Sequence, residues 1–320
     1  MTKILLGTYT KKESKGIYSI ELDETTQTLR DLKLVTATQN PTYLDFDPKT
    51  STLYSVYQEG KDAGIAAWDF NGETANLSYT QTQEGVPPCY VRYHEAEASI
   101  YDANYHGGFI RVTQDQELHK IIQYHEGSHA HYVDFDPNDD CVYVCDLGLN
   151  TIRKYELMNE IATFKTEEGM GPRHIAFHPT KKVLYAFGEH NNQIITLVDE
   201  GFELKQIQSI STLPNSDIES AGAAIRISKD GRFVYASNRG HDSIAIFKVL
   251  DDDTLEKIDT ISTYGEHPRD FAISPDQKYL VVANRDTDNL TLYLRDEDTG
   301  RLTLLQKDVY APEAVAVYFV

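Results

Sequence analysis

The stretch Asp270-Phe-Ala-Ile-Ser-Pro275, followed by Tyr279-Leu-Val-Val-Ala283, decides the fold because its pattern recurs along the chain. It consists of a short apolar strand, an Asp or Ser before a proline turn, and a second apolar strand. Recurrence at a nearly constant period indicates a repeat architecture. Further copies of the first strand and turn are Tyr43-Leu-Asp-Phe-Asp-Pro48, His131-Tyr-Val-Asp-Phe-Asp-Pro137 and His174-Ile-Ala-Phe-His-Pro179, and weaker copies without proline are Val91-Arg-Tyr-His94 and Ile225-Arg-Ile-Ser228.

The last apolar residue of each copy serves as an anchor, and the seven anchors are Phe46, Tyr93, Phe135, Phe177, Ile227, Ile273 and Val317. Their successive spacings are 47, 42, 42, 50, 46 and 44 residues. Each repeat has room for four antiparallel strands, and in the sixth these are predicted at 269–274, 279–284, 289–294 and 302–308. The sequence therefore predicts an all-β protein, a seven-bladed β-propeller of four-stranded antiparallel blades that occupies residues 1–320 as a single domain.

The seventh repeat indicates how the ring closes. Its first strand, within Pro312-Glu-Ala-Val-Ala-Val317, is the last of the chain, so its second strand is missing. The N-terminal run Lys3-Ile-Leu-Leu-Gly-Thr-Tyr-Thr10 resembles that missing strand. We therefore predict a last blade that combines residues near 312–320 with strands from the first 40 residues, which removes exposed sheet edges. A WD40 protein is disfavoured, because the Trp-Asp pair of that repeat occurs only at Trp68-Asp69.

Composition and charge limit the classes of function. The formal net charge is −20, which disfavours binding to nucleic acid and to anionic membranes. The three cysteines are odd in number and have no metal-finger spacing, so neither a disulfide scaffold nor a zinc module is expected. No signal peptide and no apolar run of about 18 residues is evident. We expect a cytoplasmic monomer or weak homo-oligomer.

The repeat register predicts which side chains meet at one end of the central channel. Because the first two strands of a blade are antiparallel, the start of the first and the end of the second share that end. The residues four positions before the anchors are Thr42, Cys89, His131, Arg173, Ala223, Arg269 and Glu313, and those twelve positions after are Gln58, Tyr105, Leu147, Glu189, Arg239 and Arg285. Four arginines are thus predicted at one mouth.

Four arginines together on an acidic protein predict an anion-binding site, because guanidinium groups suit phosphate and carboxylate. Glu189 and His131 are the candidate proton-transfer groups. A Glu between arginines should have a lowered pKa and stay ionised. In the alternative interpretation these arginines only join blades, by pairing with Asp242, Asp270, Asp286 and Glu189. Two further alternatives are a Cys89 nucleophile and an acidic metal site, the latter formed by Glu59, Asp146 and Glu189.

Several motifs resemble the seven-bladed lactonase family, which includes the propeller-type bacterial 6-phosphogluconolactonase and the fungal carboxymuconate cycloisomerase. The resemblance covers essentially the whole chain. The motifs are Gly127-Ser-His-Ala-His-Tyr-Val-Asp-Phe-Asp-Pro137, Cys145-Asp-Leu-Gly148, Gly171-Pro-Arg-His-Ile-Ala-Phe-His-Pro179, Ser237-Asn-Arg-Gly-His241, Pro268-Arg-Asp-Phe-Ala-Ile-Ser-Pro275 and Val282-Ala-Asn-Arg285.

The resemblance implies hydrolysis of 6-phosphogluconolactone, or of a related small anionic lactone, without a cofactor or metal. The implied catalytic residues are His131, Arg173, Glu189 and Arg239, and the predicted substrate contacts are His129, His174, Arg269 and Arg285. Two alternatives stay open: a cycloisomerase or lactonising enzyme that acts on an unsaturated dicarboxylate, and a propeller scaffold without enzymatic activity.

Overall fold

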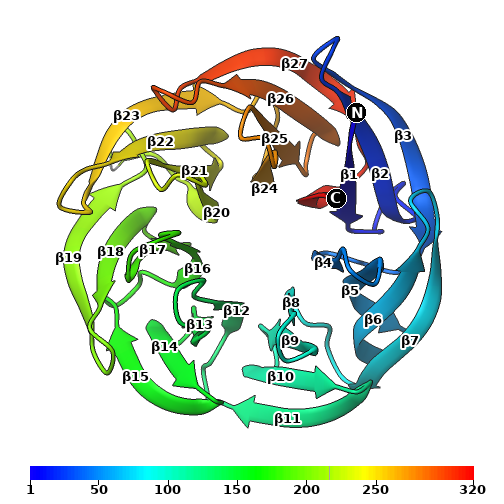
Figure 1. Cartoon of the computed structure of the whole chain (residues 1–320), viewed down its shortest axis with the longest axis horizontal. Coiled ribbons are helices and arrows are strands. Elements are labelled where there is room, and N and C mark those ends of the chain that lie inside the picture. The colour runs from blue at the N-terminus through cyan, green and yellow to red at the C-terminus, as the bar shows by residue number, and fades with distance from the viewer. Residues whose placement is uncertain (216) are drawn as a thin grey trace.

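The computed structural model describes residues 1–215 and 217–320, and their strands form seven four-stranded antiparallel sheets. The sheets are arranged as blades in a ring around a central channel (Figure 1). This confirms the seven-bladed β-propeller. The first three complete blades along the chain contain β4 (Leu44–Asp47), β5 (Thr52–Glu59), β6 (Asp62–Phe70) and β7 (Ala75–Glu84); β8 (Tyr90–His94), β9 (Ser99–Asn104), β10 (Phe109–Gln114) and β11 (Glu117–Gln123); and β12 (Ala130–Phe135), β13 (Val142–Asp146), β14 (Thr151–Glu156) and β15 (Asn159–Lys165).

The next three blades contain β16 (Pro172–Phe177), β17 (Val183–Gly188), β18 (Gln193–Asp199) and β19 (Leu204–Ser211); β20 (Ala221–Ile227), β21 (Phe233–Arg239), β22 (Ser243–Val249) and β23 (Leu255–Ser262); and β24 (Pro268–Ile273), β25 (Tyr279–Asn284), β26 (Asn289–Arg295) and β27 (Leu302–Tyr310). In the last of these, β25 begins and ends where the sequence predicted, and the other three strands differ by one or two residues at their ends. In each blade the first strand lies innermost (Figure 1).

The seventh blade is shared between the two ends of the chain, as the repeat predicted. Its strands are β28 (Ala314–Phe319), β1 (Thr2–Thr8), β2 (Gly16–Asp23) and β3 (Thr28–Ala37), in that order from the channel outwards. The C-terminal strand pairs antiparallel with β1, with Ile4 opposite Phe319 and Leu6 opposite Val317. This pairing closes the ring.

The Asp-Pro element of the repeat has a structural cause. The Asp47 carboxylate accepts a hydrogen bond from the backbone N–H of Lys49 at 2.9 Å, and Asp136 accepts one from Asn138 at 2.8 Å. An Asp that bonds the backbone two residues on forms an Asx turn, which reverses the chain between the first and second strands. The repeated motif therefore sets where each inner strand ends.

The hydrophobic core lies between neighbouring blades. One cluster joins Phe187 and Ile194 of one blade to Val234 and Phe247 of the next, and similar clusters fill the other interfaces. Both faces of a central strand are therefore covered, which explains why all six residues of β25 are buried. Among the described residues there is no helix that could cross a membrane.

Candidate active site

One mouth of the channel opens into a cavity of about 470 Å³. Each blade, or a connection beside it, contributes to the lining. The lining residues are Tyr9, Lys11, Asn40, Thr42, Gln58, Val86, Pro87, Pro88, Cys89, Tyr105, His106, His131, Glu189, Arg239 and Arg269. Eight of them occupy the two register positions that the sequence predicted to meet, namely Thr42, Gln58, Cys89, Tyr105, His131, Glu189, Arg239 and Arg269.

Three site residues sit at equivalent irregularities of the inner strands. In β12 the ladder pairs Ala130 and then Tyr132 with consecutive residues of β13, so His131 is left without a partner. Arg173 of β16 and Arg269 of β24 are skipped in the same way. An extra residue of this kind is a β-bulge, which turns a side chain away from the regular alternation of the strand. The bulges direct these three side chains towards the mouth.

Glu189 is the centre of the charged group. It follows the last residue of β17, and its Oε2 accepts from Nε of Arg173 at 2.9 Å. Nη2 of Arg239 lies 3.0 Å from the same oxygen. Both guanidinium groups also donate to the backbone of β20, at the carbonyls of Ala223 and Gly222. Glu189 thus links two arginines that come from different blades.

A glycine allows these two blades to approach at the site. The backbone N–H of Gly222 donates to the carbonyl of Glu189 at 2.8 Å. A Cβ at position 222 would lie 2.3 Å from the carbonyl oxygen of Gly188 and 2.7 Å from the ring of Phe187. Because the space admits no side chain, residue 222 can be only glycine without displacement of β17. The sequence motifs contain no signal for this residue.

Burial and charge set the protonation states of the group. Burial raises the pKa of Glu189, but Arg173, Arg239 and Arg269 outweigh it and leave the pKa below its usual value. Burial, together with Arg239 and Arg269, lowers the pKa of Arg173 to about 10. Both groups are therefore charged at neutral pH, and the predicted ionised Glu is consistent with this environment.

His131 is a neutral imidazole at the edge of the charged group. It is only 5% exposed, and its Nδ1 has no hydrogen-bond partner among the described residues. Burial, followed by the charges of Arg173, Arg269 and Arg239, holds its pKa well below the ordinary value. Because Nδ1 is buried, only the other ring nitrogen, Nε2, could accept a proton from water or substrate in the cavity.

The two histidines among the predicted substrate contacts lie outside the lining. His174 is buried behind His131, 5.2 Å away between ring centroids, and is enclosed by Tyr43, Tyr90 and Tyr132. His129 stacks on Tyr105 at 4.4 Å and contacts the Tyr105 carbonyl. These two histidines support lining residues from behind.

Arg285 also stands apart from the cavity. Its Nε donates to Asp286 at 2.6 Å and its Nη2 to the second carboxylate oxygen at 3.1 Å. The alternative interpretation, in which these arginines pair with nearby acidic residues, therefore describes Arg285, and it also describes Arg173 and Arg239, which both pair with Glu189. By contrast, the guanidinium of Arg269 has no hydrogen bond or ion pair with any described residue and faces the ring of Tyr9 at 5.7 Å.

The Cys89 nucleophile has little support in the geometry. Its Sγ lies 3.5–3.8 Å from three backbone carbonyl oxygens, and burial raises the pKa of the thiol to about 12. The thiolate, which is the nucleophilic form, is therefore scarce at neutral pH.

The acidic metal site is not assembled from the residues proposed for it. Asp146 accepts hydrogen bonds from Ser128, His129 and Leu149, and Glu59 from Tyr57. In the described part of the chain only Asp136, Asp139 and Asp199 gather closely, and Nζ of Lys154 lies 2.6 Å from Asp199 and 3.5 Å from Asp139. A lysine ammonium thus supplies the positive charge in that cluster.

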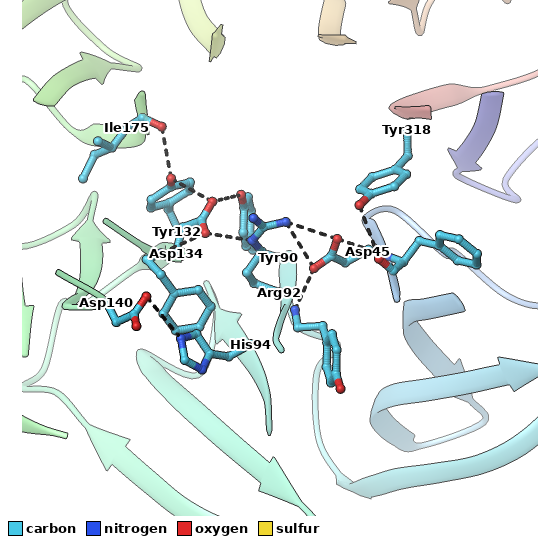
Figure 2. A network of polar contacts seen from close by, with 12 residues as sticks. Asp45, Tyr90, Arg92, His94, Tyr132, Asp134, Asp140, Ile175 and Tyr318 are labelled. Carbon is cyan, nitrogen blue, oxygen red and sulfur yellow. Dashed lines mark hydrogen bonds and ion pairs between the residues drawn. The ribbon is translucent and has the colours of Figure 1, made fainter. Parts of the chain in front are cut away.

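A second cavity, of about 520 Å³, lies farther along the inner strands. Its charged groups are paired with one another. Arg92 bridges Asp45 and Asp134, with contacts of 3.2 and 2.8 Å (Figure 2), and Arg226 pairs with Asp270 at 2.7 Å. Tyrosine hydroxyls complete the network around Asp134. At this end of the channel three carboxylates and two guanidinium groups are paired across blades, whereas the mouth keeps unpaired positive charge.

Seven of the fifteen lining residues lie outside the two register positions, and Tyr9 and Lys11 are two of these. Tyr9 and Lys11 belong to the connection between β1 and β2, and Nζ of Lys11 lies 4.6 Å from the centre of the Tyr9 ring. Connections do not follow the repeat, so a position counted from the anchors could not include them. Only the arrangement of the seventh blade brings this connection to the mouth.

Comparison with known proteins agrees with this architecture. The family model described as lactonase, seven-bladed β-propeller, matches residues 3–319. The chain belongs to this family. The curated 6-phosphogluconolactonase of Bacillus subtilis (strain 168) is 37% identical to this lactonase-family chain, and the match covers 100% of the chain and 99% of the relative.

Solved structures extend the comparison. A protein from Lactobacillus plantarum superposes with a TM-score of 0.96 at 41% identity, and all of both chains is covered. The periplasmic gluconolactonase of Pseudomonas aeruginosa superposes with a TM-score of 0.89 at 26% identity, with 100% of this chain and 99% of the other covered. Relatives of this lactonase-family chain thus include proteins named for phosphorylated and for unphosphorylated sugar lactones.

Proposed function

We propose that the protein is a lactonase that hydrolyses 6-phosphogluconolactone, or a closely related anionic sugar-acid lactone, at the mouth of the channel. The observation that carries this proposal is the grouping of Glu189, Arg239, Arg269 and neutral His131 around one open cavity. Such a site combines an anion-binding surface with a proton acceptor. The names of the relatives point to the same class of substrate.

The reaction requires only water as the second substrate. Water attacks the ester carbonyl carbon, the carbonyl oxygen gains negative charge, and the bond from this carbon to the ring oxygen then breaks. Arg239, which lines the cavity beside Glu189, would stabilise the developing oxyanion, because a preorganised cationic donor acts strongly in a partly buried site. Arg173 acts from behind, since it fixes the Glu189 carboxylate.

His131 is the group that we assign to proton transfer. Its neutral imidazole accepts a proton from the attacking water and delivers it to the leaving alkoxide, so that the ring returns to its starting state. An anionic substrate near Arg239 and Arg269 would offset two of the charges that depress the pKa of His131. Binding of the substrate would therefore make the imidazole a better base. Glu189, held by two arginines, orients the cationic groups and the water.

Two substitutions test this assignment. We expect His131→Asn and Glu189→Gln each to lower kcat/KM for 6-phosphogluconolactone by about 10²–10⁴-fold, the usual contribution of acid–base groups. The measurement is lactone hydrolysis corrected for spontaneous ring opening. Arg285→Gln is the matched control, because this arginine lies outside the cavity, and it should leave kcat/KM nearly unchanged.

The opposite results are equally clear. If His131→Asn and Glu189→Gln, shown to be folded by circular dichroism, both keep full activity, the site assignment is wrong. If the unmodified protein hydrolyses no sugar lactone but converts an unsaturated dicarboxylate, the cycloisomerase alternative replaces the proposal. An absence of turnover and of binding with all of these compounds would favour the scaffold.

A further inference from the structure

The connection between β1 and β2, residues 9–15, is held to the propeller by one buried carboxylate. Glu313, which is 3% exposed, accepts hydrogen bonds from the backbone N–H groups of Lys11 at 2.9 Å, Lys12 at 2.8 Å and Ser14 at 3.2 Å. Its own backbone carbonyl accepts from the N–H of Tyr9 at 3.1 Å. A carboxylate that receives three backbone donors defines the conformation of such a connection, as in an anion nest.

This conformation brings Tyr9 and Lys11 to the cavity. Both cations lie near the Tyr9 ring, with Nζ of Lys11 at 4.6 Å and the guanidinium carbon of Arg269 at 5.7 Å from its centre. Neither cation forms an ion pair with a residue in the described part of the chain, although the protein as a whole has a charge of −20. Two unneutralised cations beside one aromatic ring favour an anion between or above them.

The pair comes from other blades than Glu189 and Arg239 but lies beside them, since the charge of Arg269 helps to lower the pKa of Glu189. Glu189 and Arg239 come from the ends of β17 and β21, whereas Lys11 belongs to the seventh blade and Arg269 to the blade before it. The cavity therefore offers Glu189 and Arg239 to the lactone carbonyl, and Lys11 and Arg269 as a second cationic site for another part of the same ligand.

We propose that residues 9–15, positioned by Glu313, are the specificity element of the site, and that Lys11 and Arg269 bind a phosphate group carried by the lactone. This inference rests on the proposed function for the reaction and adds the residues that select a phosphorylated substrate. A phosphate monoester offers two negative charges and three acceptor oxygens to the two cations.

Lys11→Met tests the phosphate contact, and the assay compares 6-phosphogluconolactone with glucono-1,5-lactone, which lacks the phosphate. We expect the KM for the phosphorylated lactone to rise about 10- to 100-fold, the effect of a lost charged hydrogen bond, with kcat little changed. The KM for the unphosphorylated lactone should stay the same. Lys205→Met is the matched control, because Lys205 is an exposed lysine near Glu200 and belongs neither to the cavity lining nor to residues 9–15.

Glu313→Gln tests the positioning role. Gln keeps one acceptor oxygen and loses the charge, so residues 9–15 should lose their defined conformation while the blade remains folded. The expected result is the same selective rise in KM for the phosphorylated lactone, with hydrolysis of the unphosphorylated lactone retained. Equal loss with both lactones would show a structural role only and would overturn the positioning by Glu313.

Failure of this inference is distinguishable from failure of the proposed function. If Lys11→Met leaves the KM for the phosphorylated lactone unchanged, or changes both KM values equally, the specificity element is wrong although the enzyme is a lactonase. If the unmodified protein hydrolyses neither lactone, titration with 6-phosphogluconate in a calorimeter decides. Binding weakened by Lys11→Met but not by Lys205→Met would support the phosphate site, and equal or absent binding would overturn it.

Discussion

At the scale of single residues, position relative to the arginines decides what each titratable side chain can do. His131 and His174 are neighbours, and burial is the first cause that lowers the pKa of each. Only His131 lines the cavity, while His174 packs among tyrosines. The same residue type with the same direction of pKa shift is therefore a candidate proton carrier in one place and a packing group in the other.

These pKa shifts predict the pH dependence of activity. The proposed mechanism needs neutral His131 and ionised Glu189, and the pKa of each lies below its ordinary value, 6.5 for His and 4.5 for Glu. Both groups lose their active form only as the pH falls through these lowered values. We therefore expect kcat/KM to be flat from about pH 8 to pH 6.5 and to decrease only in more acidic solution. Initial rates, corrected for uncatalysed hydrolysis, measure this profile.

A loss of activity already at neutral pH would contradict this prediction. An acid limb centred at or above pH 7 would mean that the essential base has a raised pKa, which neither His131 nor Glu189 has in this structure. Such a result would exclude both residues as the group that titrates in the free enzyme.

At the scale of strands, irregular pairing positions the side chains of the site, and regular pairing holds the blades together. The inner strands β12, β16 and β24 each carry a bulge at the position that supplies His131, Arg173 or Arg269.

The middle strands of a blade are joined by their ladder of backbone pairs, and a few buried ion pairs add to this ladder. One of these ion pairs joins Asp102 on β9 to Arg111 on β10, which are opposite one another in the ladder and at most 1% exposed.

The Asp102–Arg111 pair yields a prediction about stability. Burial raises the pKa of Asp102, and Arg111 partly opposes this effect. Arg111→Met would leave a buried carboxylate without its partner, so we expect the free energy of unfolding to fall by about 3–5 kcal/mol. Chemical denaturation monitored by tryptophan fluorescence measures this change.

A double substitution serves as the control. In Arg111→Met with Asp102→Asn the buried charge is absent, and most of the lost stability should return. If the single variant is as stable as the unmodified protein, the pair does not contribute as inferred. If the double variant is no better than the single one, lost packing of the arginine stem, rather than an uncompensated charge, is the cause.

At the scale of the whole molecule, the fold depends on the pairing of β28 with β1. This ladder joins residues from opposite ends of the chain, such as Leu5 with Tyr318, and it is the closure of the ring. The C-terminal strand also contributes Ala314, Val315 and Val317 to the buried core. The other six described blades are each built from strands that follow one another in sequence.

Removal of this strand should therefore affect the whole protein. A chain that ends at Glu313 would expose the edge of β1 and lose an inner strand, a loss comparable with the typical total stability of about 5–15 kcal/mol. We expect no cooperative thermal transition by circular dichroism, and aggregation in size-exclusion chromatography. Unfolding at the same temperature as the full chain would contradict this view of closure.

A circular permutant provides the comparison. It joins residue 320 to residue 1 through a short Gly-Ser linker and opens the chain between Leu157 and Met158, in the turn between β14 and β15, where Leu157 is 84% exposed. All strands remain present, so this protein should fold. Comparison of the truncated chain with the permutant shows whether folding requires β28 itself or requires the chain ends at their present positions.

The sequence by itself determined the blade number, the closure and eight of the fifteen residues that line the mouth cavity. The spacing of the repeats can be counted directly in the sequence. Because the first two strands of a blade are antiparallel, the same count also shows which residues lie at the same end of the channel. His131, Glu189, Arg239 and Arg269 could therefore be assigned to one mouth from their register positions alone. In the sixth repeat the strand limits followed to within two residues, because turns are local and Asp, Pro and Gly mark them.

Only the tertiary structure decided how these groups interact. Arg173, Arg239 and Arg285 look alike in the repeat, yet the first two share Glu189 and the third binds its neighbour Asp286. Likewise, Lys11 lies far from Glu313 in the sequence and reaches the mouth only because the ring closes. Pairing between blades depends on curvature, bulges and connections, and these vary among repeats whose sequence pattern is the same.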